Sequence, residues 1–199
     1  MAFGQRARRR PAVEPDAARA AETGADGDAP ADPESAARTA CLDLLTTRAR
    51  SRAELATELA RRGHADEVIG PVLDRLVEVG LLDDAAFAEQ WVDARHRHRG
   101  LGRRALADEL RRKGVDTETA GVALAELGRD DERAKARELV ERRLPALGRV
   151  DDTVAVRRLV GMLARKGYDA GVAYGVVRDA LAARGTELEE VEPPDEHAG

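Results

Sequence analysis

The side chains best suited to chemistry in this sequence are basic ones in a repeated arrangement. Three pairs of basic residues each stand directly before a glycine: Arg61-Arg62, Arg112-Lys113 and Arg165-Lys166. Guanidinium and ammonium groups bind phosphates and carboxylates, and a regular row of them can match a repeating anionic polymer. The competing interpretation is that each pair only complements the negative end of a helix, which is worth about 0.3–1 kcal/mol per charge.

A second basic group occupies the stretch "RHRHRGLGRR" between residues 95 and 104. Its arginines are Arg95, Arg97, Arg99, Arg103 and Arg104. His96 and His98 lie two positions apart, so on a helix they point to different sides and do not form a metal-chelating pair. They would instead add charge to the strip below neutral pH. The strip is either a solvated face or a contact surface for phosphates or acidic patches.

Patterns typical of catalysis are missing from the sequence. There is no phosphate-binding Gly-Lys-Ser/Thr loop, no His-Glu-x-x-His and no Gly-x-Ser-x-Gly. Cys41 is the single cysteine, which excludes a disulfide framework and a thiolate metal cage. We therefore predict a protein that is not an enzyme and that has no catalytic residues, metal or cofactor.

The elements that position the basic pairs repeat along the chain. The segments "LATELARRG", "LADELRRKG" and "LVGMLARKG" end at Gly63, Gly114 and Gly167, at spacings of 51 and 53 residues. Each has leucines eight and four positions before its glycine, which stack on one helix face. The glycine provides the left-handed residue that ends the helix, and an apolar helical pattern follows after two residues. Each copy therefore contains a helix-turn-helix-like corner.

The next helices have acids placed to cap their N-termini: Asp66, Asp116 and Asp169. A further helix precedes each corner. In the first copy it covers 35–47, with Ala40, Leu44 and Leu45 facing inward, and in the third copy it covers 131–144 and ends near Pro145.

The stretch 76–100 joins the first two copies. Gly80 ends one helix, Leu81 and Leu82 enter the core, and Asp83 or Asp84 caps the next helix. On that helix Phe87, Trp91 and Ala94 recur at helical spacing, which favours core packing over stacking on nucleic-acid bases. Tyr168 and Tyr174 follow the same logic.

One site disagrees with this pattern. Gly70-Pro71 falls inside the last helix of the first copy. Either that helix starts late, with Pro71 in its first turn, or the proline bends it.

The sequence thus predicts an all-α protein made of three tandem three-helix repeats in an elongated array. The predicted divisions are a disordered extension at 1–34, repeats at 35–83, 84–130 and 131–184, and an acidic disordered tail at 185–199. The net charge of −5 comes from the ends, because residues 35–184 carry 28 basic and 25 acidic side chains. With no secretory signal and no membrane-spanning apolar run, we expect a monomer in the cytoplasm.

The segments "LDRLVEVGLLDDAAFAEQWVDAR", "LADELRRKGVD" and "LVGMLARKGYDAGVAYGVVRDAL" resemble the RecX family of recombinase regulators, over about 35–184. The resemblance implies a curved, elongated, all-helical protein without catalytic residues. It also implies binding along the groove of the RecA filament on single-stranded DNA. Inhibition of RecA ATP hydrolysis, strand exchange and co-protease stimulation is then expected, and with it regulation of recombinational DNA repair and the SOS response. The "IGPVL" segment and the long N-terminal extension depart from the family pattern.

On this interpretation the candidate contacts with RecA or DNA are the three basic pairs and the five arginines of the strip. Direct contact with single-stranded or duplex DNA is expected to be weak. One alternative is a transcriptional regulator that places a helix-turn-helix in the major groove. The helices after the three glycines lack the cluster of Arg, Asn and Gln that reads base edges, which counts against it. A helical scaffold with another partner is the third possibility.

Overall fold

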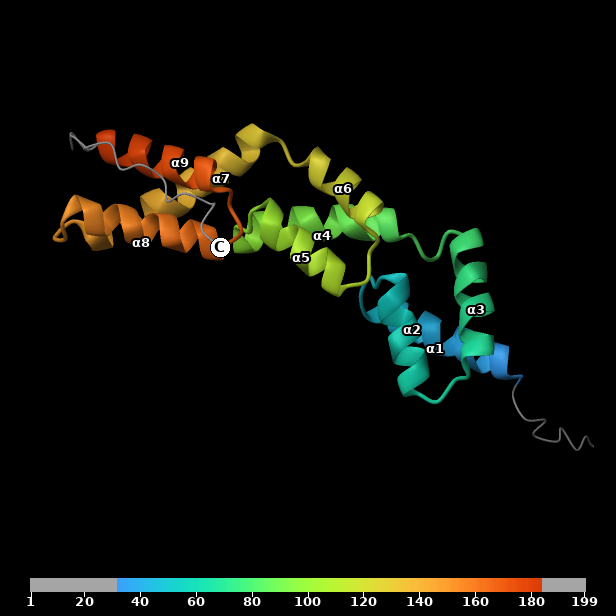
Figure 1. Cartoon of the computed structure of the whole chain (residues 1–199). Helices are drawn as coiled ribbons and strands as arrows, with labels where there is room; N and C mark the ends of the chain where they lie inside the picture. Colours follow the sequence, from blue (N-terminus) through green and yellow to red (C-terminus); the bar gives the residue numbers. More distant parts are fainter. Residues whose placement is uncertain (1–31, 184–199) are drawn as a thin grey trace, which may run out of the picture. The chain divides into compact units, whose positions relative to one another are not determined.

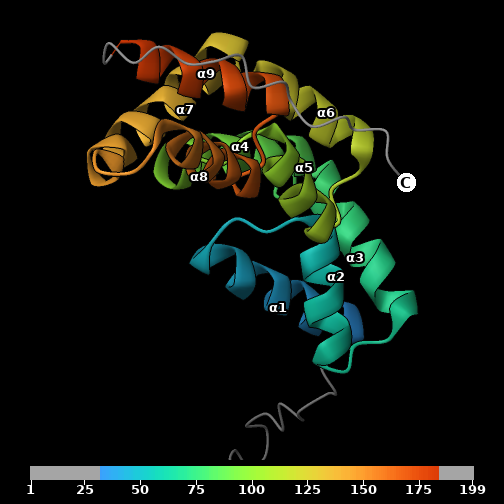
Figure 2. The same cartoon turned by 60° about the vertical axis from the view of Figure 1, so that its left-hand side comes forward.

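The computed structural model describes residues 32–183, and all of its regular structure is helical. The first repeat contains α1 (Pro33–Thr47), α2 (Arg52–Arg61) and α3 (Asp66–Glu78). The second contains α4 (Asp84–Arg99), α5 (Arg103–Arg112) and α6 (Thr117–Glu126). The third contains α7 (Arg129–Arg143), the 3₁₀ turn η1 (Leu144–Leu147), α8 (Asp152–Arg165) and α9 (Ala170–Ala182). Figures 1 and 2 show these helices in chain order.

Each repeat has a hydrophobic core of its own. Three separate clusters of buried side chains correspond to the three repeats, and the most extensive contacts between helices lie within a repeat. The two leucines of each repeated segment have no exposed surface: Leu55, Leu59, Leu106, Leu110, Leu159 and Leu163. The predicted all-helical fold of three three-helix repeats is therefore confirmed for residues 32–183.

The caps of the helices are mostly those expected. The side chains of Asp83, Asp116 and Asp169 accept hydrogen bonds from the first turns of α4, α6 and α9. The prediction for Asp66 is wrong, because Ala65 is the N-cap of α3 and Asp66 is already helical. A carboxylate in the first turn still interacts favourably with the positive end of the helix.

Several inward-facing residues were also predicted correctly, with two exceptions. Leu82 and Phe87 are buried, as is Tyr168 in the core of the third repeat. Leu81, in contrast, is 54% exposed, and Ala94 lies on the exposed face of α4. The turn after α3 is so short that only one of its two leucines reaches the core.

Pro71 lies in the middle of α3, because this helix begins at Asp66 rather than at the proline. Its ring is on the exposed side of the helix, while the neighbouring Val72 and Leu73 are buried. The late-start interpretation of Gly70-Pro71 is therefore wrong. The chain ends predicted to be disordered lie outside the described residues, except that α1 already begins at Pro33.

Candidate binding surface

The three basic pairs occupy equivalent corners of the three repeats. Each pair closes the middle helix of its repeat, and the glycine that follows has a positive φ: 88° at Gly63, 72° at Gly114 and 83° at Gly167. This confirms that glycine ends each middle helix in the left-handed conformation. The corners of the second and third repeats lie against the N-terminal end of the middle helix of the repeat before them. We call these two contacts seam 1–2 and seam 2–3.

Seam 1–2 is held mainly by side chains. The buried Ser51 hydroxyl, at the N-cap of α2, donates to the Lys113 carbonyl at 2.5 Å and accepts from the Glu54 N–H at 3.2 Å. The Lys113 ammonium pairs with the Glu54 carboxylate, which also accepts two hydrogen bonds from Arg48. Burial would raise the pKa of Glu54, but the hydrogen bonds from Arg48 and Lys113 outweigh it and lower the pKa from 4.5 to about 2.

The two acids at the start of α4 contact different repeats. Asp83 caps its own helix, α4. Asp84 accepts a hydrogen bond at 2.8 Å from the backbone N–H of Arg52, at the start of α2 in the first repeat. A carboxylate here satisfies a helix N–H that has no partner within its own helix. Asp84 therefore makes a third polar contact across seam 1–2, after those of Ser51 and Glu54 with Lys113.

Seam 2–3 is built mainly from backbone. The Gly102 N–H donates to the Lys166 carbonyl at 2.8 Å, and the Arg104 N–H donates to the Gly167 carbonyl at 3.1 Å. A Cβ on Gly167 would lie 2.2 Å from the Ala105 nitrogen, so only glycine permits this approach. The Lys166 ammonium donates to the Arg99 carbonyl at 2.6 Å.

Seam 2–3 also contains a buried ion pair. The Glu132 side chain on α7 is only 6% exposed and accepts hydrogen bonds from both the backbone N–H and the Nε of Arg103. The same guanidinium donates to the carbonyls of Leu124 and Leu127 at the end of α6. Arg103 therefore joins α5, α6 and α7 rather than standing in solvent.

These contacts separate the sequence-predicted contact residues into two groups. Arg95, Arg103, Lys113 and Lys166 bind other parts of the chain. The others have exposed side chains: Arg61, Arg62, Arg97, Arg99, Arg104, Arg112 and Arg165. Of these, Arg61 and Arg62 pair with Glu58, and Arg97 pairs with Asp93. The second member of a basic pair thus serves a seam in repeats two and three, while the first remains exposed.

Trp91 packs against two of these basic residues, Arg95 and Lys113. Its ring is half-buried and packs against Phe87, with ring centroids 5.6 Å apart. Arg95 and Lys113 both lie over the ring, 4.1 Å and 4.6 Å from its centroid, and its indole N–H donates to Glu109. Two cations close to the ring leave little room for a nucleic-acid base to stack there, and they tie Trp91 to seam 1–2.

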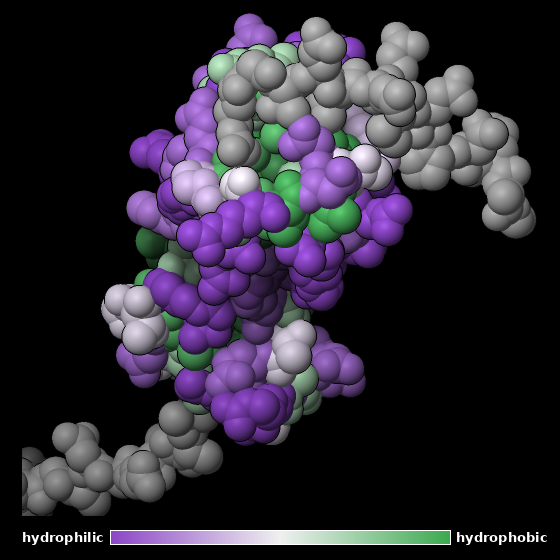
Figure 3. All heavy atoms as spheres, turned by 90° about the vertical axis from the view of Figure 1, so that its left-hand side faces the viewer, coloured by the Kyte–Doolittle hydropathy of each residue, from purple (hydrophilic) through white to green (hydrophobic). Residues whose placement is uncertain are grey.

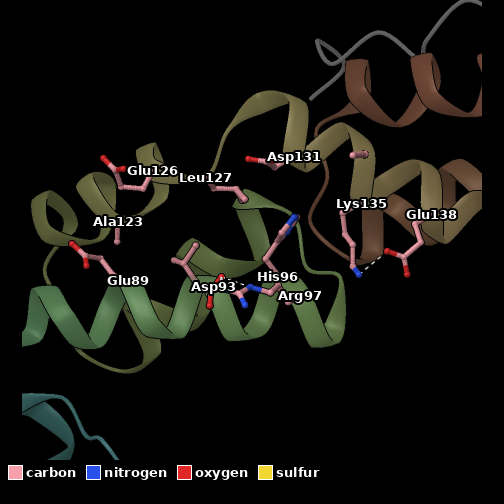
Figure 4. Close-up of a pocket in the computed structure, with 12 residues that line it drawn as sticks. Glu89, Asp93, His96, Arg97, Ala123, Glu126, Leu127, Asp131, Lys135 and Glu138 are labelled. Atoms are coloured by element: carbon pink, nitrogen blue, oxygen red, sulfur yellow. Dashed lines mark hydrogen bonds and ion pairs between the residues drawn. The ribbon is translucent and has the colours of Figure 1, made fainter.

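A mixed-charge groove of about 720 Å³ runs between α4, α6 and α7 (Figure 4). His96 lines it but is buried, with Nδ1 2.8 Å from the Leu101 carbonyl oxygen, so it does not belong to an exposed basic strip as predicted. Lys135 pairs with Glu138 across one turn of α7 in this groove. Within residues 32–183, no group of three or more His, Cys, Asp or Glu side chains is placed to hold a metal ion.

The structure adds basic residues that the sequence interpretation did not identify. A groove of about 620 Å³ in the third repeat is lined by Arg143, Arg157, Arg158, Arg165, Leu147 and Met162. On α8, the spacing of Arg158, Met162 and Arg165 is the one that places residues on a single face, so the sequence carried part of this signal. Arg143 comes from α7 and joins them only through the fold. Seen from the side that faces left in Figure 1, the surface is largely hydrophilic with small apolar patches (Figure 3).

Comparisons with known proteins agree with this architecture. Three family models match: the first three-helix domain of RecX at residues 37–76, the second at 83–124 and the third at 130–177. The regulatory protein RecX of Thermobifida fusca is 53% identical over 167 residues, which are 84% of this chain and 90% of that protein. The regulatory protein RecX of Streptomyces coelicolor is 46% identical and covers 90% of this chain and 95% of its own length.

The same fold occurs in solved structures. RecX from Lactobacillus salivarius superposes with a TM-score of 0.71 at 21% identity, covering 75% of this chain and 97% of that one. A second crystal structure of a regulatory protein RecX gives 0.69 at 22% identity, with 75% and 74% covered. Over the part of the chain described, no helix is long and apolar enough to cross a membrane. Because the three family models match in order and the relatives are similar over most of their length, the chain belongs to the RecX family.

Proposed function

We propose that this protein binds the RecA filament on single-stranded DNA and inhibits its ATP hydrolysis, strand exchange and co-protease activity. The observation that carries the proposal is membership of the RecX family over all three repeats. In this proposal the protein is a cytoplasmic, non-enzymatic monomer that regulates recombinational repair and the SOS response.

The contacts within the protein support a binding mode along a polymer. Each repeat has its own core, and the two seams connect consecutive repeats. The three corners are therefore held within one molecule at successive repeats. Each corner presents an exposed arginine, at positions 61, 112 and 165, and the first corner also exposes Arg62. Cations at successive corners can bind successive RecA protomers or the phosphates between them, and several weak contacts together give strong binding.

Binding of this protein in the groove of the RecA filament would explain inhibition without a catalytic site. A protein that bridges neighbouring protomers holds the filament in one state, and it also blocks the space that duplex DNA or a repressor substrate must enter. The mixed-charge groove between α4, α6 and α7 contributes no catalytic set of residues to this proposal.

Sequence-specific DNA binding through a helix-turn-helix is not favoured. The helix that would enter the major groove is α3, α6 or α9. Across these three helices the only basic residues are Arg75 and Arg178, and each lies next to an acid in an ion pair. Arg, Asn and Gln side chains that read base edges are otherwise absent from them.

The test is RecA ATP hydrolysis on single-stranded DNA, with this protein titrated below one copy per RecA protomer. The proposal predicts a fall in rate at substoichiometric amounts, together with co-sedimentation of the protein with the filament. An unchanged rate with no co-sedimentation would refute it.

A further inference from the structure

The arginine groove of the third repeat carries positive charge that the described residues do not neutralise. Four arginines line it, Arg143, Arg157, Arg158 and Arg165, together with the apolar Leu147 and Met162. Within residues 32–183, acids of this repeat pair with Lys135, Arg142, Arg178 and, across seam 2–3, Arg103, and none pairs with the four groove arginines. Four like charges that line one groove repel one another, so the groove favours an anionic occupant.

The C-terminal segment 185–199 has the opposite composition. It contains six carboxylates and no Lys or Arg. Its sequence "ELEEVE" also places Leu188 and Val191 among the acids. This segment can therefore match both properties of the groove: carboxylates for the arginines, and two apolar side chains for Leu147 and Met162.

The segment begins close enough to reach the groove. α8 and α9 run antiparallel against each other, because a turn of only four residues joins them. The end of α9 at Ala182 therefore lies beside the first turns of α8, as both cartoon views show (Figures 1 and 2). The 14 residues of α8 span roughly 21 Å. Fifteen extended residues span up to about 50 Å, which is more than this distance.

We propose that residues 185–199 occupy the arginine groove of the third repeat and compete with external anionic ligands for it. Attachment to α9 gives the segment an effective concentration in the millimolar range, so a weak intrinsic affinity is enough to keep the groove filled. The segment is then an internal competitor, which raises the charge density that a partner must have to bind the third repeat. This inference rests on the groove and the segment, and its test needs no RecA.

The experiment uses the full chain with its acidic segment neutralised by Glu→Gln at 187, 189, 190, 192 and 196 and Asp195→Asn. A fluorescent peptide with the natural sequence of 185–199 is added, and its binding is followed by anisotropy at low ionic strength. Because the neutralised chain no longer fills its own groove, we expect the peptide to bind it about tenfold more tightly than it binds the natural chain.

The groove is tested by adding Arg157→Gln, Arg158→Gln and Arg165→Gln to the neutralised chain, which should abolish peptide binding. The matched control removes three charges outside the groove, with Arg38→Gln, Arg75→Gln and Arg137→Gln at exposed positions, and should leave binding unchanged. Equal peptide affinity of the natural and neutralised chains would overturn the proposal. So would a neutralised chain that binds a single-stranded oligonucleotide at the groove but not the peptide, since the groove would then be a phosphate site.

Discussion

The two seams join equivalent surfaces of neighbouring repeats through different contacts. In both, the corner of one repeat lies on the N-terminal end of the middle helix of the repeat before it. Seam 1–2 uses the Ser51 hydroxyl and the ion pair between Lys113 and Glu54. Seam 2–3 uses backbone N–H groups at Gly102 and Arg104, which approach so closely that no Cβ fits on Gly167.

This difference indicates that the two seams respond to different perturbations. In seam 1–2 the pair of Lys113 with Glu54 makes stability depend on pH and salt, and the closest approach is to a side-chain atom, the Ala53 Cβ. In seam 2–3 the closest approach is to backbone atoms of Ala105, beside the buried pair of Arg103 with Glu132. The corner at Gly63 is a natural reference, because a Cβ there would meet no atom of the described residues within 4 Å. The three corners therefore form a graded series.

The largest expected effect is that of alanine at Gly167, which ends a graded series over the three corner glycines. Gly63→Ala should cost about 1–2 kcal/mol, since only the left-handed conformation is penalised. Gly114→Ala should cost more, because the new Cβ would lie 2.2 Å from the Ala53 Cβ. Gly167→Ala should cost most, since it meets the Ala105 backbone. Urea unfolding of the three variants measures this order.

A second substitution separates the clash from the conformational penalty. Ala53→Gly removes the atom that Gly114→Ala would strike, so the double variant should recover part of the lost stability. No substitution removes the Ala105 backbone nitrogen, and Gly167→Ala should have no such rescue. An equal loss in the free energy of unfolding at all three glycines would show that the close contacts at the seams add nothing to the cost of a left-handed alanine.

The next effect concerns the buried ion pair of seam 2–3. Arg103→Ala leaves the Glu132 carboxylate buried without its partner, which should cost about 3–5 kcal/mol of the free energy of unfolding. The double variant Arg103→Ala with Glu132→Ala should be less destabilised than the single one. Thermal unfolding distinguishes this structural role from a surface contact, for which Arg103→Ala would leave stability within about 0.5 kcal/mol.

A smaller, pH-dependent effect is expected in seam 1–2. The pKa of Glu54 in the folded protein is about 2, below its ordinary 4.5. Its contribution to stability is therefore complete above pH 4.5 and is lost as the pH falls towards 2. Glu54→Gln should cost about 1–3 kcal/mol at neutral pH. That difference should shrink on acidification, and a difference that stayed constant between pH 6 and pH 2.5 would contradict the assigned ion pair.

The local features of the fold were predictable from sequence, and the long-range ones were not. Gly114 and Gly167 end their helices, and Asp116 and Asp169 cap the next ones, because these effects act within one turn. Asp66 failed as a cap because Ala65 takes the N-cap position, one residue earlier. The partnership of Arg103 with Glu132 joins residues 29 positions apart, and no periodicity indicates it. For the same reason, sequence could not separate the seam-binding Lys113 from the exposed Arg112.

The most direct test of the account compares two charge-reversed variants of the full chain in binding to RecA filaments on single-stranded DNA. One carries Arg112→Glu and Arg165→Glu, the exposed members of two basic pairs, with Lys113 and Lys166 left in their seams. The control carries Arg75→Glu and Arg178→Glu, which change the net charge equally on exposed faces of α3 and α9. The account predicts that the first variant co-sediments at least tenfold more weakly, with a flatter salt dependence, while the control binds like the natural protein. Equal binding by a folded first variant and the control would contradict the assignment of the exposed corner arginines to the filament interface.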